Sequence, residues 1–187
     1  RPLQRLSVVS LLGGLTRGAA MNPHETASHL ADLAGAQCYY VAAPALTDTR
    51  SSRDVLMAQP MLREVFEKGE KVDLAFLSVG ELTATNTMTR VGLISKQDVA
   101  DLIVAGAVGD ICAHWIDREG NLVDHPLNSR VVALSPDKLR GIPCVIIASG
   151  GKAKVAALTG VLKGGMTDVL ITDELTAKGI LAQSVAP

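Results

Sequence analysis

The feature that most constrains this chain is a regular alternation of short apolar runs with amphipathic stretches. Short runs rich in Val, Ile and Leu are typical of buried parallel strands, and amphipathic stretches are typical of the helices that cover such strands. This strand–loop–helix order recurs about five times, and one small antiparallel excursion interrupts it. The pattern predicts one α/β domain over residues 1–187, with three α/β/α layers around a mostly parallel sheet.

The boundaries of the expected elements follow from capping and turn residues. We expect strands at 6–12, 38–42, 72–79, 108–116, 144–148 and 169–171, and an extended segment at 131–134. We expect helices at 22–34, 54–68 with a break near Pro60, 95–105, 135–139, 152–162 and 173–181. Asn22 should cap the first of these helices and Gly35 should end it. A hairpin turn at 117–120 should lead into Leu122.

Charge and cysteine content narrow the class of protein. A net charge of −1 argues against a domain that grips DNA by its phosphates, because such domains usually carry a basic balance. No apolar run approaches the roughly 18–20 residues that cross a bilayer, and no signal peptide is recognisable, so we expect a soluble protein without membrane contact. Cys38, Cys112 and Cys144 are isolated, which favours reduced thiols and the cytoplasm. Because an apolar run begins at Leu6, we expect part of the first strand–loop–helix unit to lie outside this chain.

Several signatures of catalysis and cofactor binding are absent from the sequence. The four histidines have no metal-ligand spacing, and no Cys-x-x-Cys pair occurs. No serine lies in a Gly-x-Ser-x-Gly context, and neither a Walker motif nor a dinucleotide-binding glycine motif occurs. We therefore expect no metal, no cofactor and no bound nucleotide.

Glycines gather at the expected carboxyl ends of the strands, which is where open parallel sheets bind ligands. They are Gly13, Gly14, Gly80, Gly109, Gly150 and Gly151. Glycine lets a backbone approach a ligand closely, and a helix that begins there offers N–H donors to an anion. One such loop indicates only a turn, whereas several at the same edge predict a ligand site.

Acidic residues follow two of these glycines. Glu81 follows Gly80, and Asp110 follows Gly109 in an apolar stretch, where an ionised carboxylate is costly to bury without partners. Sugar hydroxyls are donors that suit a carboxylate, so both residues are candidates for effector binding. In the alternative reading Asp110 only caps a turn through neighbouring N–H groups. The run 172–174 fits a helix cap and a ligand site equally well.

Basic residues are candidates for holding an anionic group. Lys154 lies in the first turn of the helix that Gly150 and Gly151 open, where a cation opposes the helix dipole and a phosphate would compensate it. Lys152 competes for this role. Arg90 could grip a phosphate through two parallel hydrogen bonds. The alternative for each of these side chains is a solvated surface position.

Seven stretches together are characteristic of one family. They are LLGG at 11–14, NPHE at 22–25, APAL at 43–46, AVGDIC at 107–112, PLNSRV at 126–131, GGKAK at 150–154 and GGMTDVLITDELTA at 164–177. With these stretches in the family's order, the chain from Leu11 to Leu181 resembles the sugar-binding domain of the SorC-type bacterial transcription regulators.

The resemblance implies a fold similar to that of the glucosamine-6-phosphate and ribose-5-phosphate isomerases, used as a sensor. It implies that a separate N-terminal helix-turn-helix domain binds DNA, and that a Gly/Thr-rich phosphate loop lies just before the first residue of this chain. Carried over by motif, the effector-binding residues are Gly13, Gly14, Asn22, Gly80, Glu81, Arg90, Asp110, Gly150, Gly151 and Lys154. Leu12 stands where some members that bind a bisphosphate carry an arginine, which favours a monophosphorylated sugar or polyol.

The favoured function is therefore a ligand-gated module that catalyses nothing. An effector would shift the equilibrium between arrangements of a homo-oligomer, a dimer or a tetramer, and the DNA-binding domain would report the change. The alternative is an isomerase-like enzyme acting on a sugar phosphate, with Asp110 as a base, although no matched acid partner is recognisable. A third reading is an oligomerisation domain with a vestigial ligand site.

Overall fold

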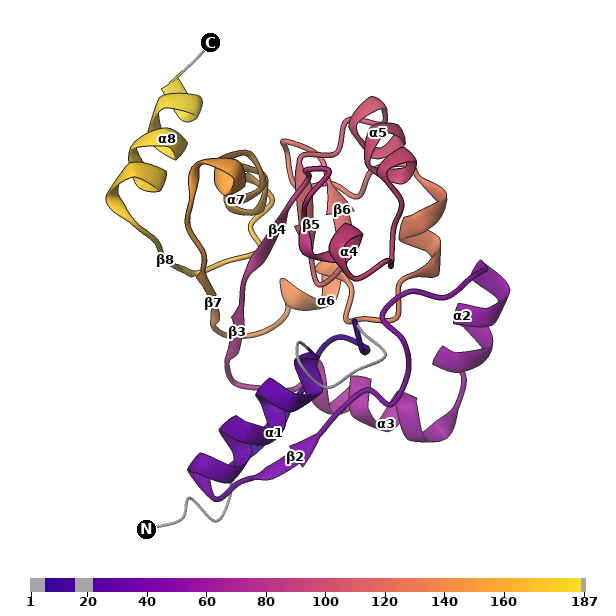
Figure 1. The fold of residues 1–187 in the computed structure, drawn as a ribbon. Helices are drawn as coiled ribbons and strands as arrows, with labels where there is room; N and C mark the ends of the chain where they lie inside the picture. The colour runs from indigo at the N-terminus through magenta and orange to yellow at the C-terminus, as the bar shows by residue number, and fades with distance from the viewer. Residues whose placement is uncertain (1–5, 16–21, 186–187) are drawn as a thin grey trace. The chain divides into compact units, whose positions relative to one another are not determined.

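The computed structural model describes residues 6–15 and 22–185, and it has the predicted α/β architecture with parallel strands. The chain divides into two compact units (Figure 1). Unit 1 comprises Arg1–Val72 and Ser129–Leu134, and unit 2 comprises Asp73–Asn128 and Ser135–Pro187. The named strands form one two-stranded and two three-stranded sheets, where the sequence predicted a single sheet.

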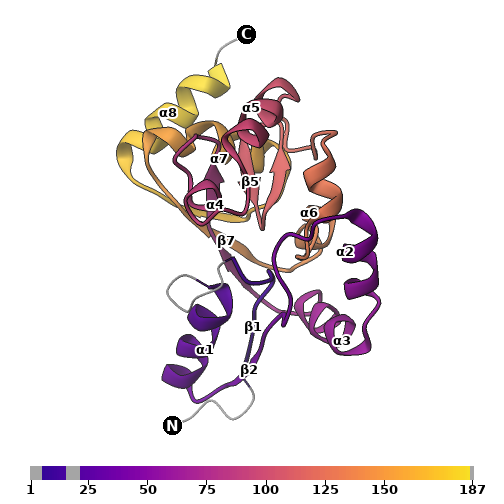
Figure 2. The same ribbon diagram turned by 45° about the vertical axis from the view of Figure 1, so that its right-hand side comes forward.

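Unit 1 is built on a parallel strand pair. Strand β1 (Ser7–Val9) pairs with β2 (Gln37–Tyr39), and helix α1 (Pro23–Ala34) connects them and packs against both (Figure 2). Pro23 occupies the first turn of α1, where its missing N–H costs nothing, and Gly35 ends the helix with φ 63°. These helix boundaries are the ones that the sequence predicted.

Two further helices complete unit 1, and they are separated at the predicted proline. Helix α2 (Arg50–Met57) begins where the Thr49 hydroxyl accepts the Ser52 N–H, and α3 (Pro60–Gly69) begins at Pro60 itself. The extended segment 131–134 returns to this unit and forms antiparallel bridges with Leu12 and Leu46. Its residues 131–134 are all buried, so the segment belongs to the core of unit 1.

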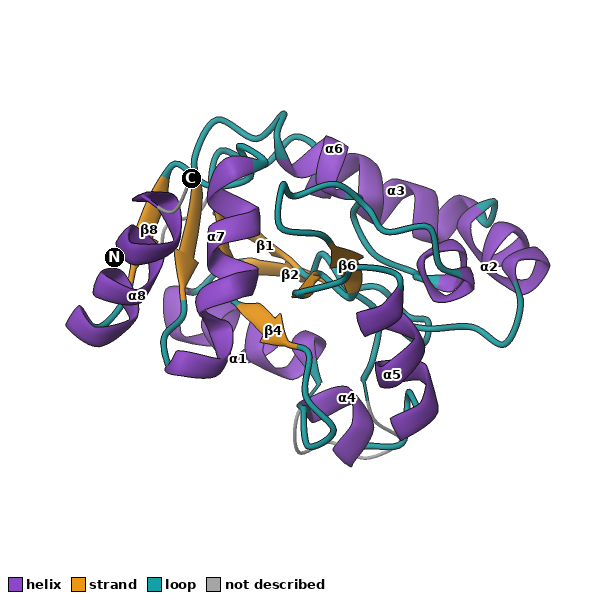
Figure 3. Cartoon of the chain, turned by 90° about the horizontal axis from the view of Figure 1, so that it is seen from above, coloured by secondary structure: helices purple, strands orange, loops and turns teal. Residues whose placement is uncertain are grey.

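Unit 2 contains a three-stranded parallel sheet in the order β3-β7-β8. The strands are β3 (Ala75–Leu77), β7 (Val145–Ala148) and β8 (Val169–Ile171). Helices α7 (Val155–Lys163) and α8 (Glu174–Val185) follow the last two strands and lie side by side (Figure 3).

The two faces of this parallel sheet differ in exposure. Ala75, Val145 and Ile147 point to one face and are buried. Phe76, Ile146 and Val169 lie opposite one another in the register and point to the other face, where Phe76 is 63% and Val169 43% exposed. The sequence predicted strands buried on both faces, and the second face, although apolar, is only partly covered within the described residues.

Unit 2 also contains an antiparallel sheet that corrects two strand predictions. Strands β4 (Val79–Glu81), β5 (Gly109–Ile111) and β6 (His114–Ile116) pair in that order. The expected strand at 72–79 therefore breaks into β3 and β4, and the expected strand at 108–116 folds back on itself. The fold-back is a two-residue turn at Cys112 and Ala113, with φ 49° and 60°.

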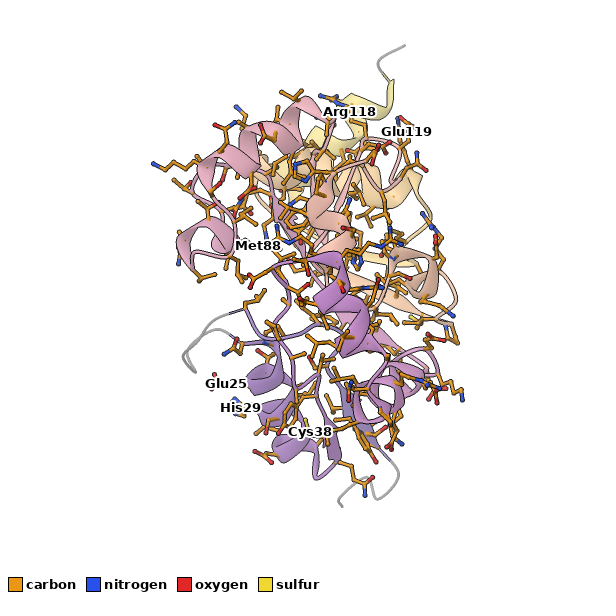
Figure 4. The ribbon with its side chains drawn as sticks, turned by 90° about the vertical axis from the view of Figure 1, so that its right-hand side faces the viewer. Glu25, His29, Cys38, Met88, Arg118 and Glu119 are labelled. Atoms are coloured by element: carbon orange, nitrogen blue, oxygen red, sulfur yellow. The ribbon has the colours of Figure 1, made fainter. Side chains whose placement is uncertain are left out.

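The predicted hairpin turn at 117–120 is present. The Asp117 carboxylate accepts the Glu119 and Asn121 N–H groups, and Gly120 has φ 80°. Arg118 and Glu119 lie at the exposed tip (Figure 4), and Glu119 forms an ion pair with Lys163 on α7 at 2.7 Å. The turn is thereby tied to α7.

Short helices fill the remaining connections of unit 2. Helix α5 (Lys96–Val104) begins with a capping box between Ser95 and Asp98, close to the predicted start. The others are α4 (Thr87–Arg90), η2 (Pro126–Arg130), whose last two residues belong to unit 1, α6 (Pro136–Leu139) and η3 (Lys152–Lys154). Helix α4 and η2 were not predicted, and the expected helix at 152–162 begins as the separate turn η3. Within 6–15 and 22–185, no helix is both long and apolar enough to cross a membrane.

Candidate functional site

Asp110 is the centre of the candidate site in unit 2. It lies in the middle of β5, and its register partner on β4 is Gly80, while Glu81 lies opposite Gly109. A Cβ atom added to Gly80 would overlap the Oδ1 atom of Asp110. Gly80 therefore leaves the space that the Asp110 side chain occupies, and the predicted approach of a ligand to this glycine stays a prediction.

Asp110, Glu81 and Lys154 form a charged cluster. Burial raises the pKa of Asp110 to about 7, the Ala113 N–H opposes this rise, the negative charge of Glu81 adds to it, and the positive charge of Lys154 also opposes it. The charges of Glu81 and Lys154 both act on Asp110, so these three predicted site residues interact electrostatically within unit 2. The Asp110 carboxyl therefore titrates at a much higher pH than an exposed aspartate.

Asp110 also has the turn-capping role that the sequence left open. Its Oδ2 atom accepts the N–H of Ala113 at 3.1 Å, which holds the left-handed turn between β5 and β6. This bond uses one of the two carboxyl oxygens. Among the described residues no hydrogen bond engages Oδ1, the atom that faces Gly80. One oxygen thus serves the turn, and the other remains available to accept a donor.

The Gly150–Gly151 loop is tied to the start of α8. The Gly151 N–H donates to Thr176 Oγ1 at 2.7 Å and to Asp173 Oδ2 at 3.2 Å. Asp173 Oδ1 accepts the Thr176 N–H at 2.9 Å, so Asp173 caps α8, and its hydrogen bonds with Thr176 lower its pKa. The helix-cap reading of the run 172–174 is confirmed. The Gly151 amide is accordingly engaged within the chain.

Lys154 and Arg90 differ in their surroundings. Lys154 is half-buried at the end of η3, its N–H donates to the Gly151 carbonyl, and η3 contacts β4. Arg90 is the last residue of α4, and its side chain is exposed and forms no ion pair in the described part of the chain. The structure therefore joins Lys154 to the charged cluster and shows no such link for Arg90.

The remaining predicted residues belong to unit 1. Gly13 packs so closely against Ala43 and Pro44 that a Cβ atom would lie 2.6 Å from the Ala43 carbonyl oxygen. Asn22 does not cap α1 with its side chain, which corrects the prediction. Its Oδ1 atom instead accepts the Leu15 N–H at 2.8 Å and holds the loop that contains Gly13 and Gly14. The loop amide has taken the acceptor that the helix would have used.

Comparison with known proteins relates these features to a family. The family model for a sugar-binding domain matches residues 1–182. The erythritol catabolism regulatory protein EryD of Brucella abortus is 34% identical over 178 residues, which are 95% of this chain and 56% of that protein. This chain belongs to the sugar-binding domains of the SorC-type transcriptional regulators.

Further relatives and solved structures agree with this assignment. The transcriptional regulator YjhU of Escherichia coli is 30% identical, over 96% of this chain and 55% of its own. A DeoR family transcriptional regulator from Listeria monocytogenes superimposes with a TM-score of 0.89 at 27% identity, covering 96% of this chain and 70% of that one. The full-length sorbitol operon regulator SorC from Klebsiella pneumoniae has the same fold, with a TM-score of 0.84 at 23% identity over 95% and 60%. The sugar-binding domain spans just over half the length of its curated relatives.

Sequence reasoning missed two serines of this sugar-binding domain, Ser78 and Ser149, and considered Thr172 only as part of the run 172–174. Ser78, Ser149 and Thr172 each follow directly on the last residue of a parallel strand in unit 2. The signal was present in the sequence, because each lies at the carboxyl end of a predicted strand or within one residue of it. The carboxyl ends of these strands were identified in the sequence by their glycines and charged residues only.

Proposed function

We propose that this sugar-binding domain senses a small phosphorylated sugar or polyol, and that a helix-turn-helix domain outside this chain reads out the result on DNA. The observation that carries the proposal is the charged cluster, in which Asp110 and Glu81 offer acceptors and Lys154 offers a positive charge. Sugar hydroxyls donate to carboxylates, and a phosphate pairs with an ammonium group. A relative named for erythritol catabolism supports a polyol skeleton.

The proposed effector-binding residues divide by their role. Asp110 and Glu81 would accept sugar hydroxyls, and Lys154 and Arg90 would pair with the phosphate. The remaining proposed residues are Gly13, Gly14, Asn22, Gly80, Gly150 and Gly151, which shape the loops around the effector. Support is strongest for Asp110, Glu81 and Lys154, because the charges of Glu81 and Lys154 change the pKa of Asp110.

We propose that the domain is not an enzyme, in keeping with relatives that are named as transcriptional regulators. One observation favours the alternative of a sugar-phosphate isomerase. A carboxyl with a pKa of about 7, as in Asp110, is suited to act as a general base at neutral pH. Incubation with sugar phosphates, followed by chromatography of the products, separates the two functions, because a sensor returns its ligand unchanged.

Thermal unfolding with a panel of ligands tests the sensor. The panel comprises erythrose phosphate, ribose phosphate and sorbitol phosphate, each phosphorylated on a terminal carbon, and the unphosphorylated compounds. A ligand at about a hundred times its dissociation constant adds roughly 2.7 kcal/mol to the free energy of unfolding. Asp110→Ala should abolish the shift, and Asp101→Ala, an exposed carboxylate on α5, should preserve it. If no phosphorylated compound stabilises the wild type, the proposal is wrong.

The remaining features of the proposed function concern the whole chain. Residues 1–187 would act as one effector-binding module in the cytoplasm, assembled as a homo-oligomer, either a dimer or a tetramer. The exposed apolar face of the β3-β7-β8 sheet supports self-association, because large exposed apolar patches mark contact surfaces.

A further inference from the structure

Three hydroxyl residues form a row along one edge of the parallel sheet of unit 2. Ser78 follows β3, Ser149 follows β7 and Thr172 follows β8, and these strands are neighbours in the order β3-β7-β8. We call these three residues the hydroxyl row. It occupies the carboxyl ends of parallel strands, which is the edge at which open α/β sheets bind small molecules.

Hydrogen bonds fix neighbouring members of the row. The Ser78 Oγ atom lies 3.1 Å from Ser149 Oγ and 3.4 Å from the Val79 carbonyl oxygen, and Ser149 Oγ is the nearer acceptor for its one hydrogen. The Ser149 N–H donates to the Ile171 carbonyl at 3.0 Å, directly beside Thr172. Ser149 therefore lies between the other two members. Its position is held from both sides, by a side-chain bond and by a backbone bond.

The hydrogen-bonding capacity of Ser149 is only partly used. A serine hydroxyl has one hydrogen to donate and can accept as well. In the described part of the chain, Ser149 Oγ accepts from Ser78, and no acceptor takes the Ser149 hydrogen. Ser149 is only half-buried, so this donor is open to a small molecule. The Thr172 Oγ1 atom has no partner among the described residues either, but it is fully buried.

The hydroxyl row adjoins the charged cluster along the chain on both sides. Ser78 is followed by β4, which contains Gly80 and Glu81, and Ser149 is followed by the loop that leads to Lys154. Strand β4 and η3 are in contact. A ligand held by the cluster would thus have Ser149 next to the two elements that carry Glu81 and Lys154.

We propose that the Ser149 hydroxyl donates a hydrogen bond to an acceptor oxygen of the effector, and that Ser78 positions it. This inference rests on the proposed function, since it adds a residue to the same site. It assigns to Ser149 a role in specificity, because a hydroxyl donor selects a ligand with an oxygen at that place. The oxygen belongs to the phosphate or to a hydroxyl of the carbon chain.

Two serine-to-alanine variants separate effector binding from structure. Ser149→Ala removes the donor, and Ser78→Ala removes only its neighbour. With ribose phosphate in isothermal titration calorimetry, Ser149→Ala should raise the dissociation constant about fivefold, as expected for one neutral hydrogen bond, and Ser78→Ala about twofold or less. Both variants should keep the unliganded midpoint of thermal unfolding. Equal losses of affinity in the two variants would mean that the hydrogen bond between the serines, and not a bond from Ser149 to the effector, accounts for the loss, and the inference would be wrong. Unchanged affinity in Ser149→Ala would also overturn it.

The choice of probe identifies the acceptor and distinguishes the two proposals. Inorganic phosphate is titrated in competition with ribose phosphate against the wild type and Ser149→Ala. A loss of affinity for both probes assigns the bond to a phosphate oxygen, and a loss for ribose phosphate alone assigns it to a sugar oxygen. A wild type that binds none of the phosphorylated compounds refutes the sensor proposal together with this inference. If the wild type binds a phosphorylated compound and Ser149→Ala binds it with the same affinity, this inference alone is refuted.

Discussion

At the scale of single residues, Asp110 combines two tasks that are usually separate. One carboxyl oxygen holds the Ala113 amide and so stabilises a turn made of two residues with positive φ. Neither Cys112 nor Ala113 favours that conformation, which glycine and asparagine adopt more readily. Asp110 supports this strained turn, and the charges of Glu81 and Lys154 act on its carboxyl. We therefore expect its substitution to change the stability of the fold as well as effector binding.

The titration of Asp110 gives a stability prediction. Its pKa in the folded protein, about 7, lies above the ordinary value of 3.8, so the folded state holds a proton that the unfolded state has lost between these two values. Stability that is complete below the lower value is lost as the pH rises towards 7. Between about pH 5 and about pH 8, the wild type should lose roughly 2–3 kcal/mol relative to Asp110→Asn, which cannot titrate.

Urea unfolding at the two pH values measures this difference. Asp110→Asn is the matched comparison, because it keeps an acceptor for the Ala113 N–H. The charges of Glu81 and Lys154, which act on Asp110, are retained in both proteins. Parallel pH profiles of the two proteins would contradict the prediction.

At the scale of elements, the start of α8 controls the Gly150–Gly151 loop. Asp173 accepts the Thr176 N–H and hydroxyl, and it also accepts the Gly151 N–H, so one carboxylate caps a helix and anchors a loop. The loop leads into η3 and Lys154. Two hydrogen bonds from the Gly151 N–H, to Asp173 and to Thr176, therefore link the start of α8 to the loop that leads to Lys154.

Asp173→Ala should lower the thermal midpoint by a few degrees and weaken effector binding several-fold, because the cap and one of the two hydrogen bonds that hold the Gly151 N–H are lost. Glu174→Ala is the matched control, since Glu174 is the next residue and forms only an exposed ion pair with Lys178. Differential scanning fluorimetry with and without ribose phosphate gives both quantities. If Asp173→Ala loses stability but keeps its affinity for ribose phosphate, the loop does not contribute to effector binding and the prediction is wrong.

The elements also show why sequence patterns succeeded in some places and failed in others. Helices α1 and α5 were predicted near their true starts because proline at α1 and the capping residues of α5 act locally. The strand expected at 108–116 failed because Cys112 and Ala113 carry no turn signal, and the turn depends on the Asp110 side chain. Asn22 failed as a cap because the N–H of Leu15, seven residues earlier, donates to its side-chain oxygen. Each of these side chains has more than one backbone N–H nearby in the sequence, and the sequence does not show which N–H it accepts.

The same distinction applies to the candidate site. Glu81, Asp110 and Lys154 were predicted from their places after glycines, and their charges interact in the structure. The engagement of the Gly151 amide by α8 was not predictable, because it depends on how two helices pack. Ser78 and Ser149 were overlooked because serine at the end of a strand is common in turns.

At the scale of the whole molecule, the apolar face of the β3-β7-β8 sheet gives a prediction about assembly. Phe76 and Val169 lie on either side of Ile146 on that face, and Ile171 is 53% exposed. Phe76→Glu should shift a dimer or tetramer towards monomers, because a charge would have to be buried in the contact. Val104→Glu on α5 is the control, since Val104 is exposed elsewhere in the fold. Sedimentation velocity measures the masses, and a monomeric wild type would contradict the prediction.

The segment 129–134 has a consequence for how the protein is made. It lies in unit 1, yet the chain passes through much of unit 2 before reaching it. During synthesis on a ribosome, Leu12 and Leu46 cannot acquire their bridging partners until Val131 and Ala133 have emerged. Unit 1 is therefore synthesised first in large part but cannot complete its folding until residues 129–134 have been made. A fragment that stops at Val72 should expose apolar side chains that this segment covers in the folded protein.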